Sequence, residues 1–270
     1  MRPCFVGNLT CLKILSIGSG ISLQYLQLDS CTALEDLEIK CCEQLVALEG
    51  MQSLGTLRSL VLHKNSILKS LQLYSCTSLE RLEIDWCSSL VALEGLRSLV
   101  SLKHVVLFRS AALDSLATLE SFEQIEGIPS HSYELFFPAL ESLKIDDLSL
   151  LNTSFCKGLI CLRSLKLTFL NATKLIDEQE RALLLLGSLQ ELCFVDCDDL
   201  VDLPAGLRGL PCLKALKIIG CISISGLPKE GLPLSLEELM IFRCSAELSK
   251  QCRLLATNKL EVEIDGDFVD

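Results

Sequence analysis

One short phrase, Leu-x-x-Leu-x-Ile/Leu, recurs along this 270-residue chain at a near-constant interval of 22 to 24 residues, with two longer steps. Apolar positions that alternate with polar ones are typical of a short strand with one buried face and one exposed face. Such a chain stacks one small unit on the next, because each repeat contacts only its neighbours. The copies begin at Leu12, Leu34, Leu57, Leu79, Leu102, Leu140, Leu162, Leu189, Leu213 and Leu236, with a degenerate copy at Leu260.

A fixed period of this length is the sequence signature of a leucine-rich-repeat solenoid. We therefore predict an α/β solenoid of about 10–11 coils, a horseshoe with a parallel concave β-sheet. Its convex side is expected to be irregular or short-helical. This architecture favours a binding surface over an active site.

Two overlapping spacings compete for the concave sheet. Leu23 and Leu68 open extra copies of the phrase 11 residues before Leu34 and Leu79. A coil needs about 20 residues, so an 11-residue step cannot complete one. We assign Leu34 and Leu79 to the concave sheet, and Leu23 and Leu68 to the returning half of each coil. The segment from Leu23 recurs 45 residues later with long runs of identity, including the block VALEG, which indicates a tandem duplication of two coils.

The whole chain, residues 1–270, is predicted to be a single leucine-rich-repeat domain. An irregular excursion interrupts the repeat at about residues 111–138. A short convex helix is expected at about 175–186, because an acidic first turn there precedes an apolar body and a glycine. A C-terminal cap is expected at about 245–270.

Five of the 15 cysteines occupy one repeat position, three residues after the last apolar residue of a strand. There a small side chain turns inward and bonds backbone groups that are freed where the strand ends. We favour this structural role over a metal site, because zinc sites need close cysteine pairs, whereas these thiols fall one to a coil. The position holds Cys42, Asn65, Cys87, Cys197, Cys221 and Cys244.

Charge and cysteine usage restrict the partners and the compartment. A formal net charge of −11 argues against nucleic acid or an anionic membrane as the main partner. No apolar run reaches the roughly 18 residues of a membrane helix. The odd total of 15 cysteines, five of which recur at one repeat position, is typical of reduced packing residues. We therefore expect a cytoplasmic or nucleocytoplasmic protein without a membrane span.

Motifs for catalysis or cofactor binding are not found in the sequence. It contains no phosphate-binding GxxxxGK[ST] loop, no HExxH motif and no nucleophile elbow. Its three histidines, His63, His104 and His131, share no spacing that implies a site. We predict no enzyme activity, no cofactor and no metal.

The x positions of the strands, with the residues that follow them, are the candidate binding residues. Exposed Trp, Phe and Arg are the side chains that most often anchor protein interfaces, so Trp86, Phe108, Arg109 and Phe169 are the preferred group. The alternative is that Trp86 and Phe108 pack against neighbouring strand ends, because a shift of one residue exchanges the two faces of a strand. The full candidate set is Arg81, Asp85, Trp86, His104, Phe108, Arg109, Lys144, Lys166 and Phe169.

The LxxLxIxxC phrase with LEGL or LPxGL linkers resembles the C-terminal repeats of plant intracellular nucleotide-binding leucine-rich-repeat disease-resistance proteins, most closely the coiled-coil class of grasses. The resemblance covers nearly the whole chain. It departs from the family before the final strand, where residues 254–259 replace a usual Gly-x-Asp-Trp and Ile-Ala-His-Ile-Pro stretch. The residues that carry it are Leu79–Cys87, Leu189–Cys197, Leu203–Leu207, Leu213–Cys221, Leu236–Cys252 and Glu263–Gly266.

The resemblance implies a role in recognition and autoregulation within an innate-immune receptor of plant defence. Its partners would be a pathogen effector or a guarded host protein, and the nucleotide-binding module of the same receptor class. No nucleotide site carries over, because no residues here match that module, and the chain is expected to be a fragment, a truncated product or a partner-dependent piece. The alternative is a free-standing intracellular adaptor or scaffold, such as a ubiquitin-ligase substrate adaptor.

Overall fold

The computed structural model describes residues 4–5, 9–20, 22–110 and 137–269. They belong to two compact units, Met1–Leu140 and Glu141–Asp270, here called unit 1 and unit 2. Nearly all of the predicted excursion at 111–138 lies outside the described residues.

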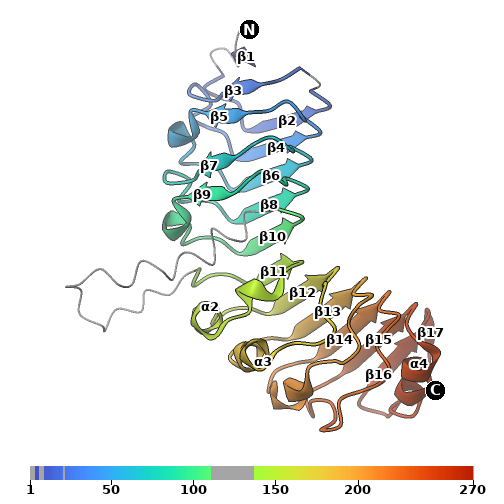
Figure 1. Ribbon diagram of the computed structural model, residues 1–270. Coiled ribbons are helices and arrows are strands. Elements are labelled where there is room, and N and C mark those ends of the chain that lie inside the picture. Colours follow the sequence, from blue (N-terminus) through green and yellow to red (C-terminus); the bar gives the residue numbers. More distant parts are fainter. Residues whose placement is uncertain (1–3, 6–8, 21, 111–136, 270) are drawn as a thin grey trace. The chain divides into compact units, whose positions relative to one another are not determined.

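Unit 1 carries five parallel strands in one sheet, ordered as they occur along the chain (Figure 1). Their pairing is in register, so that Leu37, Leu60 and Leu82 form one buried row across neighbouring strands. Two of the strands follow Leu34 and Leu79, which confirms the predicted register. The strands are β2 (Ile14–Gly18), β4 (Asp36–Lys40), β6 (Ser59–His63), β8 (Arg81–Asp85) and β10 (His104–Phe108).

In the part of unit 1 that the structure describes, the returning halves of the coils are more regular than the sequence indicates. The extra Leu-x-x-Leu copies form short parallel strands in two small sheets, β1-β3-β5 and β7-β9. Glutamine and glutamate side chains join adjacent coils on these strands, for example Gln27 to Glu49 at 2.9 Å. The elements are β1 (Cys4–Phe5), β3 (Tyr25–Gln27), β5 (Ala47–Glu49), β7 (Ser70–Gln72) and β9 (Ala92–Glu94), with 3-10 turns at Met51–Ser53 and Leu96–Ser98.

Unit 2 contributes six parallel strands and one antiparallel strand that pairs with the last of them (Figure 1). The antiparallel strand covers the edge of β16, which would otherwise expose unpaired backbone groups. Together with the repeating phrase, the two strand ladders identify the chain as a leucine-rich-repeat solenoid. The strands are β11 (Ser142–Ile145), β12 (Ser164–Thr168), β13 (Glu191–Val195), β14 (Ala215–Ile219), β15 (Glu238–Phe242), β16 (Glu261–Ile264) and β17 (Asp267–Phe268).

Short helices or 3-10 turns lie in the returning halves of most coils in unit 2. Helix α3 (Asp177–Leu184) begins with acidic residues that favour a helix N-terminus, and the Gln179 side chain accepts a hydrogen bond from the backbone N–H of Ile176. Helix α4 (Ala246–Arg253) is capped by the Ser245 hydroxyl, which accepts from the N–H of Leu248. The others are α2 (Thr153–Lys157) and 3-10 turns at Leu148–Leu150 and Ala205–Gly209.

A left-handed residue ends most of the strands. Trp86, Phe169 and Arg243 have φ values of 55°, 52° and 52°, a conformation that is uncommon outside glycine. The turn directs the next side chain into the core, where its polar atom meets backbone carbonyls. Cys87 and Cys197 illustrate the arrangement, because each thiol lies near the carbonyl of its own strand end and that of the preceding strand.

Thiol labelling tests this packing. Burial raises the pKa of Cys76 to about 11 and that of Cys252 to about 12, so both thiols stay protonated and unreactive at neutral pH. Cys11, Cys161 and Cys212 are exposed. We expect iodoacetamide at pH 7.5 to modify these three before the buried cysteines in the folded chain, and all 15 cysteines after denaturation, as read by mass spectrometry. Labelling of Cys76 as fast as that of Cys161 would contradict the packing.

Candidate protein-binding surface

The exposed face of the unit 1 sheet carries charges that pair between neighbouring coils. At the positions just before the strands, Lys13 lies 2.8 Å from Glu35, and Glu80 lies between Arg58 at 3.4 Å and Lys103 at 2.7 Å. Hydrogen bonds from these lysines hold the pKa of Glu35 and of Glu80 below the usual range. Because their charges are already matched, these side chains are poor candidates for contacts with a charged partner.

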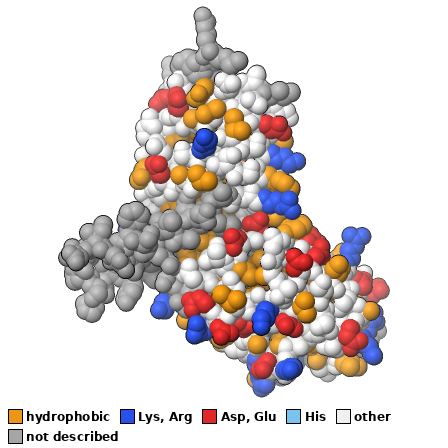
Figure 2. All heavy atoms as spheres, viewed as in Figure 1, with side chains coloured by type: hydrophobic (Ala, Val, Ile, Leu, Met, Phe, Trp, Pro, Cys, Tyr) orange, Lys and Arg blue, Asp and Glu red, His pale blue; other side chains and the backbone are white. Residues whose placement is uncertain are grey.

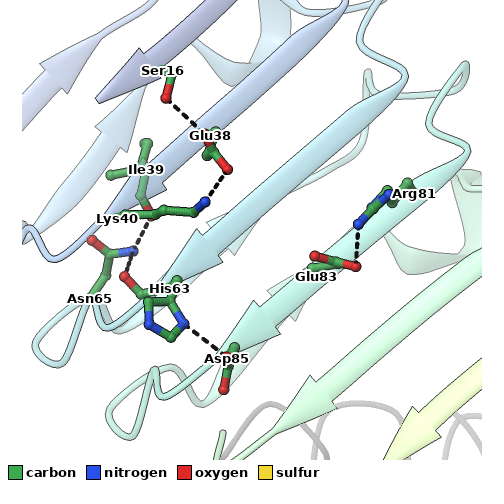
Figure 3. A network of polar contacts seen from close by, with 9 residues as sticks. All are labelled: Ser16, Glu38, Ile39, Lys40, His63, Asn65, Arg81, Glu83 and Asp85. Carbon is green, nitrogen blue, oxygen red and sulfur yellow. Dashed lines mark hydrogen bonds and ion pairs between the residues drawn. The ribbon is translucent and has the colours of Figure 1, made fainter. Parts of the chain in front are cut away.

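Polar contacts also cross the middle of this face (Figure 3). Glu38 accepts a hydrogen bond from Ser16 at 2.7 Å and pairs with Lys40 on its own strand. His63 Nδ1 lies 2.8 Å from Asp85 Oδ2 on the next strand, while Asp85 Oδ1 is buried and has no hydrogen-bond partner. The solvent-facing side of the unit 1 sheet thus carries many internally matched polar contacts, with single apolar side chains between them at Ile14, Val61 and Val106.

An aromatic and cationic cluster forms where β8 and β10 end. The rings of Trp86 and Phe108 meet edge to face, with centroids 6.0 Å apart and planes at 79°. The Arg109 guanidinium lies over the Trp86 ring, 4.3 Å from its centroid, which is a cation–π geometry. Trp86 remains 41% exposed, whereas Phe108 is only 8% exposed. We call Trp86, Phe108 and Arg109 the tryptophan cluster.

The structure thus brings together part of the predicted site. Asp85 directly precedes Trp86 in the chain. Phe108 packs against the Trp86 ring instead of presenting its own ring to solvent. Arg81 and His104 are in-register neighbours at the other end of the same two strands, where Arg81 pairs with Glu83 at 2.7 Å.

The remaining predicted residues belong to unit 2 and form a separate group. Lys144 and Lys166 are in-register neighbours on β11 and β12. Phe169 follows β12 in the left-handed conformation and is 40% exposed.

Sequence reasoning missed a second group on the unit 2 face. Five apolar side chains occupy x positions of three successive strands, where charged residues are more usual. Four of them are at least partly exposed, whereas Cys193 is only 6% exposed. The available signal was an apolar residue at an x position, as in the strands ELCFV, ALKII and ELMIF, where it stands directly beside the repeat leucines. We call these residues the apolar strip: Cys193, Val195, Ile219, Met240 and Phe242.

Ion pairs border the apolar strip on the amino-terminal side of the strands. Lys217 Nζ lies 2.9 Å from Glu191 and 3.5 Å from Glu238, so its ammonium is neutralised by two carboxylates on the flanking strands. The hydrogen bond from Lys217, supported by one from Ser164, lowers the pKa of Glu191.

A lowered carboxyl pKa makes stability depend on pH. The Glu191 carboxylate stabilises the fold above its unfolded pKa of about 4.3, and this contribution is lost as the pH falls toward the lower folded value. We expect the unfolding free energy of the wild type to decline between pH 5 and pH 3 more steeply than that of Glu191→Gln, as measured by urea titrations. Equal slopes would contradict the pairing.

Acidic and basic side chains are interspersed over the surface in view, instead of gathering by sign (Figure 2). No helix of the described residues is long and apolar enough to cross a membrane. Within the same residues, no group of three or more His, Cys, Asp or Glu side chains could hold a metal ion.

Comparisons with known proteins find similarity among solved structures. Models of protein families give no match, and neither do curated protein sequences. An internalin, inlF, from Listeria monocytogenes is 18% identical with a TM-score of 0.40, over 89% of this chain and 85% of that one. The functional domain of InlJ from Listeria monocytogenes, which includes a cysteine ladder, is 15% identical with a TM-score of 0.35, over 96% of this chain and 59% of that one. A leucine-rich-repeat protein of Leptospira interrogans is 16% identical with a TM-score of 0.29, over 94% of this chain and 96% of that one.

Proposed function

We propose that this chain is a protein-interaction solenoid and that the tryptophan cluster is one of its contact points. The observation that carries this proposal is the Trp86 ring, 41% exposed and stacked against Arg109 at the end of the unit 1 sheet. Trp and Arg dominate the binding energy of protein interfaces, because they bury a large area and also offer polar contacts. The Trp86 ring is held in place by Phe108, so little side-chain entropy is lost on binding.

The biological setting we propose is the recognition and autoregulatory region of a plant intracellular nucleotide-binding leucine-rich-repeat receptor. The support is the LxxLxIxxC phrase with its LEGL and LPxGL linkers, which resembles the repeats of that class. A surface of this kind would bind the nucleotide-binding module in the resting state and a pathogen effector or guarded host protein on activation. A ligand that prefers the released state then shifts the population toward activity. The proposal places the chain in the cytoplasm and assigns it no catalysis.

Co-precipitation from plant cells tests both parts of the proposal, with the chain as bait and a nucleotide-binding module of the same receptor class as prey. We expect the wild-type chain to capture the module, and Trp86→Ala with Arg109→Glu to reduce capture at least tenfold. Phe108 stays unchanged because it is buried. Tyr74→Ala is the matched control, since Tyr74 is 60% exposed on the returning half of a unit 1 coil.

Capture that is unaffected by the cluster variant would exclude the tryptophan cluster as the contact. No capture by a folded wild-type chain would reject the receptor role and favour a free-standing adaptor or scaffold.

A further inference from the structure

The apolar strip runs across the strands of unit 2, at right angles to the chain direction in each strand. Val195 pairs in register with Ile219, and Ile219 pairs with Phe242, so three apolar side chains stand in one row on β13, β14 and β15. Cys193 and Met240 flank Lys217 in the neighbouring row. Phe242 is 38% exposed, and Val195, Ile219 and Met240 are partly exposed.

The charge of Lys217 is drawn away from this surface. Its ammonium lies between Glu191 and Glu238 toward the amino-terminal side of the strands, which leaves its alkyl chain between Cys193 and Met240. The strip is therefore continuous and apolar over three coils. Solvent-facing apolar side chains that gather in this way mark interaction sites more often than isolated ones do.

The two ends of the strip carry opposite charges. Lys166 stands on β12, in the same row as Cys193, and Glu263 stands on β16, in the same row as Met240. Neither makes an ion pair with the described residues. Glu261 and Asp265 add to the acidic end, on and just after β16. A partner therefore meets a basic end, an apolar centre and an acidic end in that order.

The spacing of the rows favours a helix as the occupant. Neighbouring strands lie about 4.8 Å apart, and an α-helix advances about 5.4 Å per turn, so one side chain per turn can meet one coil. An extended strand laid along the row would repeat its same-face side chains every 6.8 Å or so, out of step with the coils. The four steps from β12 to β16 span roughly 19 Å, which corresponds to a helix of about 13 residues.

We propose that the apolar strip binds an amphipathic helix of a partner protein. Its apolar residues recur at i, i+3 or i+4, and i+7, its acidic first turn faces Lys166, and its basic last turn faces Glu263. This polarity also suits the helix, because acidic residues stabilise a helix N-terminus and basic residues its C-terminus. The inference extends the proposed interaction role to unit 2 and gives the partner a definite chemistry.

A phage-displayed library tests this assignment with purified chain as the target. The probe is a helical-hairpin scaffold with one exposed 14-residue helix randomised. We expect selected helices to share the apolar spacing above, with acidic first and basic last turns. Ile219→Asp and Phe242→Glu should each weaken binding at least tenfold. Val61→Asp is the matched control, because Val61 holds a solvent-facing position on β6 of unit 1.

The charge order is tested by selecting again on the double variant Lys166→Glu with Glu263→Lys, for which helices with the reversed charge order should emerge. Failure to enrich any helix, or binding that survives both Ile219→Asp and Phe242→Glu, would overturn the proposal. Helices enriched in the same charge order on both targets would overturn the assigned orientation. This selection uses only the purified chain, so its outcome is independent of the co-precipitation. Helices can be selected even if the nucleotide-binding module is not captured, and the module can be captured even if no helix is selected.

Discussion

Replacing Gly95 with alanine is expected to lower the unfolding free energy of unit 1 by about 3 kcal/mol or more. Gly95 has φ +82°, in the left-handed region, and a Cβ there would lie 2.4 Å from the backbone nitrogen of Tyr74. The clash is with the backbone of the preceding coil, so no side-chain rotation relieves it. Gly50 is the equivalent glycine in the other copy of the duplicated segment. It has φ +83°, and a Cβ there would also lie 2.4 Å from a backbone nitrogen, that of Asp29. Gly50→Ala should therefore cost a similar amount.

Trp86 provides the measurement, because it is the single tryptophan of the chain and lies in unit 1. Urea unfolding followed by its fluorescence should show a large loss for Gly95→Ala. Gly55→Ala should stay within about 0.5 kcal/mol of wild type, since its nearest neighbour would be an ordinary 3.7 Å away. Equal midpoints for Gly95→Ala and Gly55→Ala would refute the close backbone approach.

Removal of the Asn65 side chain is expected to have the second large effect. Asn65 is fully buried and joins two coils, because its amide group donates to the carbonyls of Ile39 at 2.9 Å and His63 at 3.3 Å. Its carbonyl oxygen accepts from the backbone N–H of Cys42 at 3.3 Å. Asn65→Ala leaves these buried groups without partners and opens a cavity, so we expect a loss of about 3 kcal/mol or more.

Asn65→Cys is the informative comparison. A thiol serves at this position in Cys87, where it lies near the carbonyl of Leu62 on the preceding strand. It offers one weak donor to the carbonyls and is a poor acceptor for the N–H of Cys42, so about half of the loss should be recovered. The same fluorescence assay applies. An Asn65→Ala chain within about 1 kcal/mol of wild type would show that these hydrogen bonds do not stabilise the junction.

The fold could be predicted because its signal is periodic and local. The repeat leucines mark each strand, and the 11-residue test separated Leu34 and Leu79 from the extra copies at Leu23 and Leu68. The short strands of the returning halves escaped prediction, because a three-residue strand such as β3 differs little from an irregular coil until a neighbour pairs with it. Similarly, the left-handed turn after most strands leaves no composition signal, since Trp86, Lys64 and Arg243 all adopt it.

The site was harder to predict, because burial at a strand end depends on neighbouring coils. The sequence predicts the same exposure for Trp86 and Phe108, yet the Trp86 ring is exposed and the Phe108 ring packs beneath it. Charged positions such as Glu80 gave no hint that neighbouring coils neutralise them. Ile219 and Met240 stand close to repeat leucines in the sequence. From sequence alone, an apolar residue at an exposed strand position cannot be distinguished from a core residue.

Hydrogen–deuterium exchange on the complex between this chain and a nucleotide-binding module tests whether the sheet side of unit 1 is the binding surface. We expect slower exchange on binding in peptides that contain the end of β8 and β10, residues 81–87 and 104–110. Peptides from the returning halves of the same coils, residues 70–76 and 92–98, should exchange as in the free chain. Protection confined to the returning halves would contradict a binding surface on the sheet side of unit 1.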